Sequence, residues 1–290
     1  MHAFQGGSAG TARTTLDITP DPAQYWKTRC KQALKKPSPG RVHRLRQTCR
    51  QIEAVLLLDG IERLPVKRKR GLKLARVLLK KSNALRDLDT VIRILRKEGV
   101  EIRQRRRRKK YAAKAHATLI ELAPRVSKWA KRWRKTRQEN PAESPVPHYP
   151  LEKIHRDIDR LVAQLRQDLE RFSPHAPESF EPVHRDRVLL KRRYYQLLLC
   201  PAQALVHDGE ADRRERRLQG VKSLLSLTGQ IHDRLIVEQR LPKTALSSTD
   251  RLHVQIKNAA VIDALAEELR GRLRELLSLT AMAARLRVVS

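Results

Sequence analysis

Apolar residues recur every three to four positions from about residue 20 onward, which is the period of amphipathic helices. Prolines, glycines and capping residues divide this pattern into segments with definable ends. Asp21-Pro22 and Ser38-Pro39 each place an N-cap residue before a proline in the first helical position. The pattern predicts eight helices, over residues 21–36, 39–59, 66–98, 101–138, 151–172, 180–206, 210–241 and 248–286.

A proline-rich stretch divides the predicted helices into two sets of four. Residues 141–150 (PAESPVPHYP) hold four prolines and cannot continue a helix, so we interpret them as a linker. We therefore expect a flexible N-terminus over residues 1–19, an N-terminal half over 20–140 and a C-terminal half over 151–290. Aromatic residues make up only 4% of the chain, which argues against a β-sandwich or barrel and favours an all-α fold.

The two halves contain an internal repeat. Val42-His43-Arg44-Leu45-Arg46 with the later Arg50 recurs 141 positions on as Val183-His184-Arg185-Asp186-Arg187 with Lys191. A second match has an offset of 146 and aligns Leu72, Ala75, Arg76, Leu79 and Asp87 with Leu218, Val221, Lys222, Leu225 and Asp233. The repeat predicts two four-helix bundles related by an internal pseudo-twofold axis.

The repeated motif forms a cationic stripe on one helix of each half. His43, Arg46 and Arg50 are spaced i, i+3, i+7, which places them within about 60° of one another on a helix. The second copy has the same spacing in His184, Arg187 and Lys191. A solvated helix face explains any single arginine, but solubility does not require the same charges at the same spacing in both halves. We therefore expect the two stripes to share a role.

The third predicted helix of each half adds a second basic line. In the first half this line is formed by Lys73, Arg76 and Lys80, and in the second half, more loosely, by Arg214, Arg217 and Lys222. Two cationic helices per half, brought together across the axis, would line a groove. Asp87 and Asp233 are expected either to orient nearby arginines and lysines or to form ordinary pairs within their own helix.

Composition indicates what such a groove would bind. The chain has 290 residues, and 63 Lys+Arg against 31 Asp+Glu give a net charge of +32, which implies a polyanionic partner. Nucleic acid, acidic membrane, acidic protein and inorganic polyphosphate all fit this charge. Arginine meets phosphate oxygens with two parallel N–H bonds, and lysine acts as a point charge. A histidine can add a hydrogen bond, or a positive charge below about pH 6.5, although a structural role explains each histidine equally well.

Together these residues resemble a known family. The motifs around His43 and His184, with Arg86-Asp87 and Gly229-Gln230-Ile231-His232-Asp233 ending the third helices, are similar to those of the conserved-histidine α-helical domain, CHAD. The resemblance spans roughly residues 20–286. It implies two four-helix bundles around a basic groove that binds inorganic polyphosphate. It also implies ligand roles for His43, Arg46, Arg50, His184, Arg187 and Lys191, with Arg76 and Lys222 on the third helices.

Residues 101–137 form a strongly basic segment, with 15 Lys+Arg against two Glu. The segment could be a wall of the groove or a separate patch for nucleic acid or acidic lipid, and a solvated face explains part of its charge. Trp129 and Trp133 lie four residues apart, a spacing that favours packing in the core over stacking on a ligand.

The remaining features argue against catalysis and secretion. HExxH, CxxC, GxxxxGK[ST] and GxSxG motifs are absent, as are a signal sequence and any run of 18 apolar residues. Three cysteines without CxxC spacing suit buried thiols in a reducing compartment. We expect a cytoplasmic, non-catalytic protein without metal or cofactor that binds polyphosphate, with association with polyphosphate granules as a further expectation. The alternatives are a nucleic-acid-binding protein and an accessory or regulatory subunit of a polyphosphate-processing enzyme.

Overall fold

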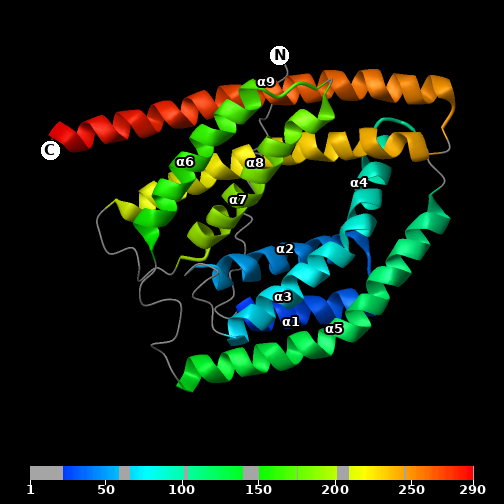
Figure 1. Cartoon of the computed structure of the whole chain (residues 1–290), viewed down its shortest axis with the longest axis horizontal. Coiled ribbons are helices and arrows are strands. Elements are labelled where there is room, and N and C mark those ends of the chain that lie inside the picture. The colour runs from blue at the N-terminus through cyan, green and yellow to red at the C-terminus, as the bar shows by residue number, and fades with distance from the viewer. Residues whose placement is uncertain are drawn as a thin grey trace, which may run out of the picture.

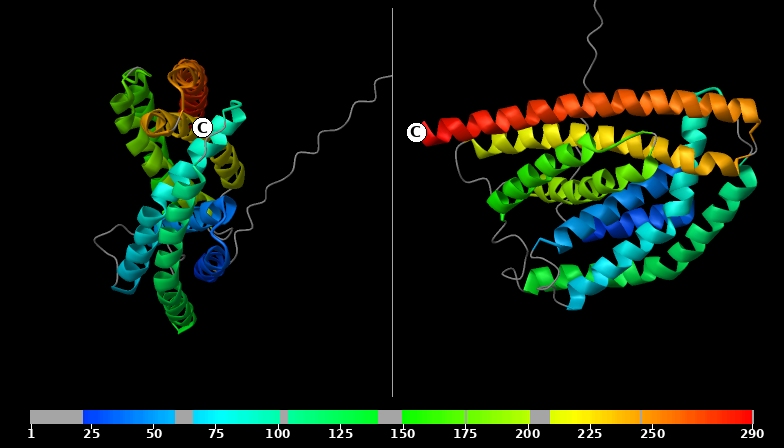
Figure 2. Two further views of the ribbon diagram at one scale, coloured as in Figure 1. Left: turned by 90° about the vertical axis from the view of Figure 1, so that its right-hand side faces the viewer. Right: turned by 45° about the horizontal axis from the view of Figure 1, so that its top comes forward.

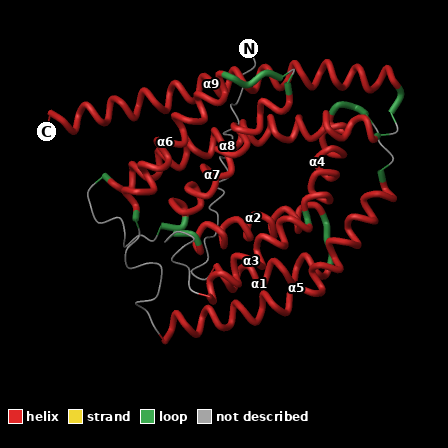
Figure 3. Tube along the Cα trace, viewed as in Figure 1, coloured by secondary structure: helices red, strands yellow, loops and turns green. Residues whose placement is uncertain are grey.

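The computed structural model of the chain is helical throughout its regular secondary structure (Figure 3). The structure describes residues 22–58, 66–100, 104–139, 150–174, 176–200, 209–244 and 246–289. The expected flexible N-terminus, and all of the expected linker except Pro150, lie outside the described residues. The prediction of an all-α protein is therefore confirmed for the part of the chain that the structure describes.

Nine α-helices make up the described part of the chain. They are α1 (Pro22–Lys35), α2 (Pro39–Leu56), α3 (Val66–Lys81), α4 (Asn83–Lys97), α5 (Arg105–Glu139), α6 (Leu151–Glu170), α7 (Glu181–Leu198), α8 (Glu210–Arg240) and α9 (Ser248–Val289). Two short 3-10 helices, η2 (Pro177–Phe180) and η4 (Leu241–Lys243), precede α7 and follow α8. Seven of the eight predicted helices match one observed helix each, and six of them agree within a few residues at each end. The helix predicted over 180–206 is wrong at its C-terminal end, because α7 ends at Leu198 and the next two residues are not helical.

The prediction of one helix over residues 66–98 is wrong, because this segment divides at Ser82 into α3 and α4. The Ser82 hydroxyl donates to the carbonyl oxygen of Leu78 at 2.7 Å, and the Arg46 guanidinium donates to the carbonyl of Leu79 at 2.6 Å. The Leu78 carbonyl also keeps its ladder bond from the Ser82 N–H at 3.2 Å, so the bond from Arg46 to the Leu79 carbonyl marks the point at which the segment divides. The helix α4 ends at Lys97, and Gly99 two residues later has a φ of 78°, the left-handed conformation common after helix C-termini.

The N-terminal core is formed by α1, α2, α3 and α5, which pack against one another. The rings of Trp26 and Trp129 meet edge to face with centroids 5.4 Å apart, and Trp133 stacks on Trp129 at 5.3 Å. Trp129 is buried, and its indole nitrogen donates to the Lys67 carbonyl oxygen at 2.9 Å. The spacing of the two tryptophans thus reflects packing between helices, as the sequence indicated.

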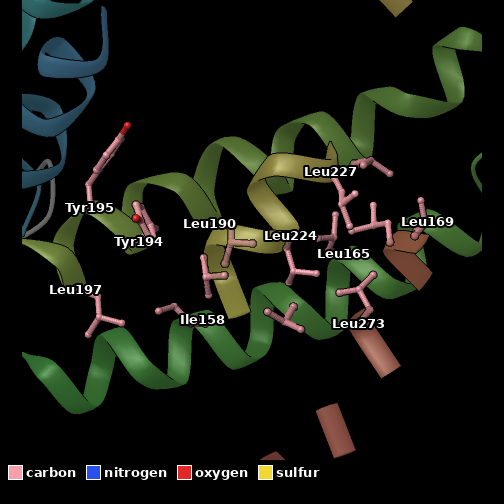
Figure 4. Packing of buried hydrophobic residues seen from close by; sticks show 14 of the residues in the cluster. Ile158, Leu165, Leu169, Leu190, Tyr194, Tyr195, Leu197, Leu224, Leu227 and Leu273 are labelled. Carbon is pink, nitrogen blue, oxygen red and sulfur yellow. The ribbon is translucent and has the colours of Figure 1, made fainter. Parts of the chain in front are cut away.

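The C-terminal core is formed by α6, α7, α8 and α9 and consists mainly of leucine, isoleucine and valine side chains. Figure 4 shows Ile158 and Leu165 of α6 facing Leu190 of α7 and Leu224 of α8. Each of these four side chains is essentially inaccessible to solvent.

The two cores are joined through α2, α4, α7 and α8. Figure 1 shows α9 and α8 along one edge of the molecule and α5 along the opposite edge, with α4 running from one set toward the other; Figure 2 shows the same arrangement from two more sides. Helix α2 packs on α7, and α4 packs on α8 through a core that includes Val91, Leu95, Ile236 and Val237. The side-chain amide of Gln196 on α7 donates to the Ala54 carbonyl oxygen of α2 at 2.9 Å. These contacts position the four helices that surround the site.

Cys30, Cys49 and Cys200 are buried thiols that form no disulfide with one another, as the cysteine pattern predicted. Burial raises the pKa of Cys49 to about 12, so this thiol stays protonated. Among the helices that the structure describes, none is long and apolar enough to cross a membrane.

The contact between Gly71 and Trp129 makes a specific prediction about stability. A Cβ added at Gly71 would lie 2.5 Å from Cε2 and Cζ2 of the Trp129 ring, so Gly71→Ala forces the tryptophan out of its packing. We expect the free energy of unfolding to fall by about 1–3 kcal/mol. Urea denaturation followed by tryptophan fluorescence measures this change.

Gly271→Ala is the matched control, because Gly271 lies inside α9 with no other atom within 4 Å of the added Cβ. Alanine is the better helix former, so this variant should gain about 0.5–1 kcal/mol. A Gly71→Ala protein as stable as Gly271→Ala would contradict the packing described for Trp129.

Candidate functional site

A cavity of about 920 Å³ lies between the two halves of the chain. Its lining comes from α2, α4, α7 and α8, with Leu79 of α3 as an additional residue. These are the four helices that join the two cores, and they surround the central part of the molecule in Figure 1. The outer helices α1, α5, α6 and α9 contribute no residue to the lining.

The lining is rich in charge and unbalanced in favour of cations. Its basic residues are Arg44, Arg46, Arg50, Arg86, Arg93, Arg187, Lys191 and Arg192. Its carboxylates are Glu53, Asp87, Asp89 and Asp233. Eight basic residues against four carboxylates leave the cavity with an excess of four positive charges when its histidines are neutral and Lys191 is protonated.

The structure brings both cationic stripes to this cavity. The residues of the α2 stripe (His43, Arg46 and Arg50) and those of the α7 stripe (His184, Arg187 and Lys191) all line it. Because α2 packs directly on α7, the repeated spacing places the two stripes on facing sides of one space.

The other four predicted site residues lie elsewhere. Lys73, Arg76, Lys80 and Lys222 are exposed and do not line the cavity. Arg76 contacts the site only indirectly, because its Nε lies 3.2 Å from Oε1 of Glu53. The basic line of α3 therefore faces the outside of the molecule, whereas Arg214 and Arg217 of α8 are partly buried and donate to backbone carbonyls of α7 and α6.

Arg46 and Arg187 occupy equivalent repeat positions but have different surroundings. The Arg46 guanidinium donates to the Leu79 carbonyl oxygen at 2.6 Å and to the Ser82 hydroxyl at 2.8 Å, so it stabilises the C-terminal end of α3. Arg187 faces the uninterrupted helix α8, where a Cβ on Gly229 would lie 3.0 Å from its Nη2. Its buried Nε has no hydrogen-bond partner among the described residues.

Lys191 lies in a cluster of positive charges. Burial, followed by the charges of Arg187, Arg50, Arg86 and Arg46, lowers the pKa of Lys191 to about 7. No carboxylate forms an ion pair with this lysine within the described ranges. The cavity thus holds its lysine partly unprotonated at neutral pH.

Three histidines, His43, His184 and His232, line the cavity. The rings of His184 and His232 stack with centroids 4.4 Å apart. Burial, His184 and Arg187 lower the pKa of His232 to about 3, and burial with nearby cations also lowers the pKa of His184 and of His43. The surroundings of these three histidines therefore disfavour the charged imidazolium form.

The two repeated aspartates link the halves to each other. Asp233 on α8 accepts from Arg86 and from Arg93 on α4, with Arg93 Nη2 at 3.0 Å. Asp87 on α4 contacts Arg86 at 3.3 Å and Arg240 of α8 at 3.7 Å. The expected role as an arginine partner is confirmed, and the partners come mainly from the opposite half and not from the same helix.

Arg86, Arg93 and His232 line the cavity but were not predicted as site residues. The offset-146 match of Asp87 with Asp233 marked their neighbourhood in sequence. What it did not reveal is that α4 leaves the first core and packs on α8, which puts the arginines of α4 beside the second half.

The basic segment 101–137 does not form a wall of the cavity. Its described part lies on α5, where residues such as Arg106, Lys109, Lys128 and Lys131 are exposed. This segment is therefore a surface separate from the site.

No group of three or more histidine, cysteine or carboxylate side chains is arranged to hold a metal ion in the part of the chain that the structure describes. No family model, curated protein or solved structure matches the chain.

The Lys191 cluster predicts a pH-dependent stability. The pKa of this lysine is about 7 in the folded protein against an ordinary value of 10.5, so the unfolded chain binds more protons between these pH values. Stability should rise with pH across this window, and the cost of the buried charge is greatest below pH 7. Lys191→Met should raise the free energy of unfolding by on the order of 2 kcal/mol at pH 6, and by much less near pH 10. Urea denaturation at a series of pH values measures both proteins.

Lys73→Met provides the control, because Lys73 is exposed on α3 and outside the cavity. Its effect should be small at every pH. A difference between wild type and Lys191→Met that does not change between pH 6 and pH 10 would contradict the charge cluster.

Proposed function

We propose that this protein binds inorganic polyphosphate in the cavity between its two halves, without processing it. The observation that carries the proposal is the excess of positive charge in the lining, where Arg187 and Lys191 have no anionic partner among the described residues. Holding like charges together away from bulk water is unfavourable, so a bound polyanion would offset this cost.

Phosphate chemistry fits the types of side chain that line the cavity. Seven of its eight basic residues are arginines, whose guanidinium groups meet phosphate oxygens with paired N–H donors. The cations come from four helices in both halves, so a chain of linked phosphates can contact several of them at once. A single phosphate ion satisfies fewer of these charges, and we therefore favour the polymer as the ligand.

The resemblance to CHAD supports the same proposal from the sequence. Its implied ligand residues His43, Arg46, Arg50, His184, Arg187 and Lys191 all line the cavity. Its implied third-helix residues Arg76 and Lys222 do not, so we leave them out of the proposed binding site.

We also propose that the two halves are related by an approximate twofold axis through the cavity. Equivalent helices make equivalent contacts: α1 with α2 corresponds to α6 with α7, and α1 with α5 corresponds to α6 with α9. The pairing of Asp233 with Arg93 also has a counterpart in Asp87 with Arg240. Such exchanged pairs are the signature of an interface between like units.

The carboxylates of the lining support binding without hydrolysis. Metal-assisted phosphate hydrolysis needs carboxylates that hold Mg²⁺. Glu53 pairs with Arg50 and Arg76, and Asp89 pairs with Arg108. Asp87 and Asp233 form ion pairs with arginines of α4 and α8. Each of the four carboxylates in the lining is therefore already paired with an arginine.

The outer surface favours nucleic acid as a second candidate ligand. Exposed cations on α3 and α5, including Lys73, Lys80, Arg106 and Lys109, lie outside the cavity and are open to a larger polyanion. Phosphate contacts alone would give binding with little sequence preference. The two candidates therefore differ in which cations they use.

Salt dependence distinguishes the two candidates. A polyanion that contacts n cations releases counterions, and log affinity falls with log salt with a slope of about −0.7n to −0.9n. Arg187→Gln/Lys191→Gln should weaken polyphosphate binding at least tenfold and should flatten the slope by about 1–2. Fluorescence titrations of polyphosphate, tRNA and duplex DNA at several salt concentrations measure these quantities.

The control is Arg106→Gln/Lys109→Gln, which removes one arginine and one lysine from the exposed face of α5. This pair should leave polyphosphate binding within about twofold of wild type, because diffuse surface charge contributes little at physiological salt. Equal losses from the two double variants would contradict a formed site, and a larger loss from the α5 pair with nucleic acid would favour the second candidate.

A further inference from the structure

Lys191 differs from the other charged residues of the site in its chemistry. It is the single lysine among the residues that line the cavity. Arginine keeps its proton under all ordinary conditions, whereas a lysine amine that loses its proton becomes a nucleophile. The amine of Lys191, inside an arginine-lined cavity, can therefore act as a nucleophile as well as bind an anion.

The surroundings of Lys191 favour loss of its proton and offer no carboxylate partner among the described residues. Helix α2 places Arg46 and Arg50 near it, α4 places Arg86, and α7 itself places Arg187 one turn away. Together with burial, these charges lower the pKa of Lys191 to about 7, so about half of the amine is neutral at physiological pH.

The other titratable groups near Lys191 do not reverse this effect. Asp233 of α8 is paired with arginines of α4, and Glu53 of α2 is paired with Arg50 and Arg76. His43 of α2 has its pKa lowered by burial and then by Lys191, so it adds no counter-charge.

Tyr195 is a further titratable residue beside Lys191. The Tyr195 ring lies 5.9 Å from Nζ of the lysine, and burial keeps its phenol protonated by raising its pKa. Helix α6 also packs on α7, but none of its residues lines the cavity.

The arginines that suppress protonation are also suited to hold a phosphate group beside the amine. Arg187 has a buried Nε without a partner among the described residues. A small molecule that carries both a phosphate and an electrophilic carbon would be held by its phosphate, with its carbon close to a neutral amine. Acyl phosphates, the mixed anhydrides of a carboxylic acid and phosphoric acid, have this composition.

We propose that Lys191 is an acylation site for acyl phosphates that enter the cavity. The lone pair of Nζ attacks the acyl carbon, and an amide bond forms. The bond between the acyl carbon and the phosphate oxygen breaks, and the electron pair leaves with inorganic phosphate. Nζ gives up one proton to water. The arginines stabilise the negative charge that develops on the leaving phosphate.

Acylation would change the site itself. The amide of an acylated lysine carries no charge, so acylation removes the positive charge of Lys191 from the cavity lining. Polyphosphate affinity should then fall. The acylation itself requires only that a single phosphate group enter the cavity, and so it can be tested separately from polyphosphate binding.

The experiment treats the full chain with acetyl phosphate at pH 7.0 and quantifies acetylation of each lysine by peptide mass spectrometry over time. Lys191 should react at least tenfold faster than Lys73 and Lys222, which are exposed and outside the cavity. The Lys191 rate should rise up to about pH 8 and then level off. Lys191 reacting no faster than Lys73 would overturn the proposal.

Two controls separate the contributions of the amine and of the phosphate. An acetyl N-hydroxysuccinimide ester carries no phosphate, so its preference for Lys191 should be much weaker. Added inorganic phosphate should slow acetylation of Lys191 by acetyl phosphate and leave Lys73 unchanged. Equal preference with both reagents, with no effect of phosphate, would show that the cavity does not bind the reagent.

Arg187→Gln tests whether an arginine of the cavity promotes the reaction of Lys191 with acetyl phosphate. It removes a phosphate donor and a charge that lowers the pKa of Lys191, so acetylation of Lys191 should fall at least fivefold at pH 7.0. Arg106→Gln on α5 should leave the rate unchanged, and urea denaturation of both variants shows that they are folded. An unchanged rate in a folded Arg187→Gln protein would overturn the role of the arginines. Polyphosphate titrations of the same proteins report on the proposed function separately.

Discussion

Mutual repulsion among cations is the constraint that governs the centre of this molecule. Burial first, and then the charges of neighbouring arginines, lower the pKa of Arg46, Arg187 and Lys191. Their repulsion is opposed by two hydrophobic cores on either side and by ion pairs that join α4 to α8. The surrounding structure therefore holds these cations close together despite their repulsion.

The two halves meet this constraint in different ways, although their motifs are alike. In the first half, Arg46 is bonded to the end of α3 where the helix breaks at Ser82. In the second half, α8 runs on without a break, so Arg187 finds no free carbonyl and stays open to the cavity. Arg46 of the first motif therefore stabilises the end of α3, whereas Arg187 of the second motif makes no corresponding contact with α8.

Sequence periodicity predicted most helices and both cavity stripes because each depends on local spacing. His43, Arg46 and Arg50 lie away from the apolar face of their own helix, and the repeat in the second half identified their counterparts. Periodicity did not show on which side a neighbouring helix would pack. Lys73 and Lys80 therefore have the same spacing as the true lining residues and still face outward. The break at Ser82 depends on a side chain 36 positions away, which no local pattern reveals.

Gly229 contributes to the site through the atoms that it lacks. A single methyl group at this position would lie 3.0 Å from Nη2 of Arg187, so the glycine leaves the space in which the guanidinium rests. The residue is in ordinary helical backbone and needs no special conformation of its own. Gly229 contributes the space that its missing side chain leaves for the guanidinium of Arg187. In related chains the two positions should therefore change together, and a larger side chain at the glycine should accompany a shorter one at the arginine.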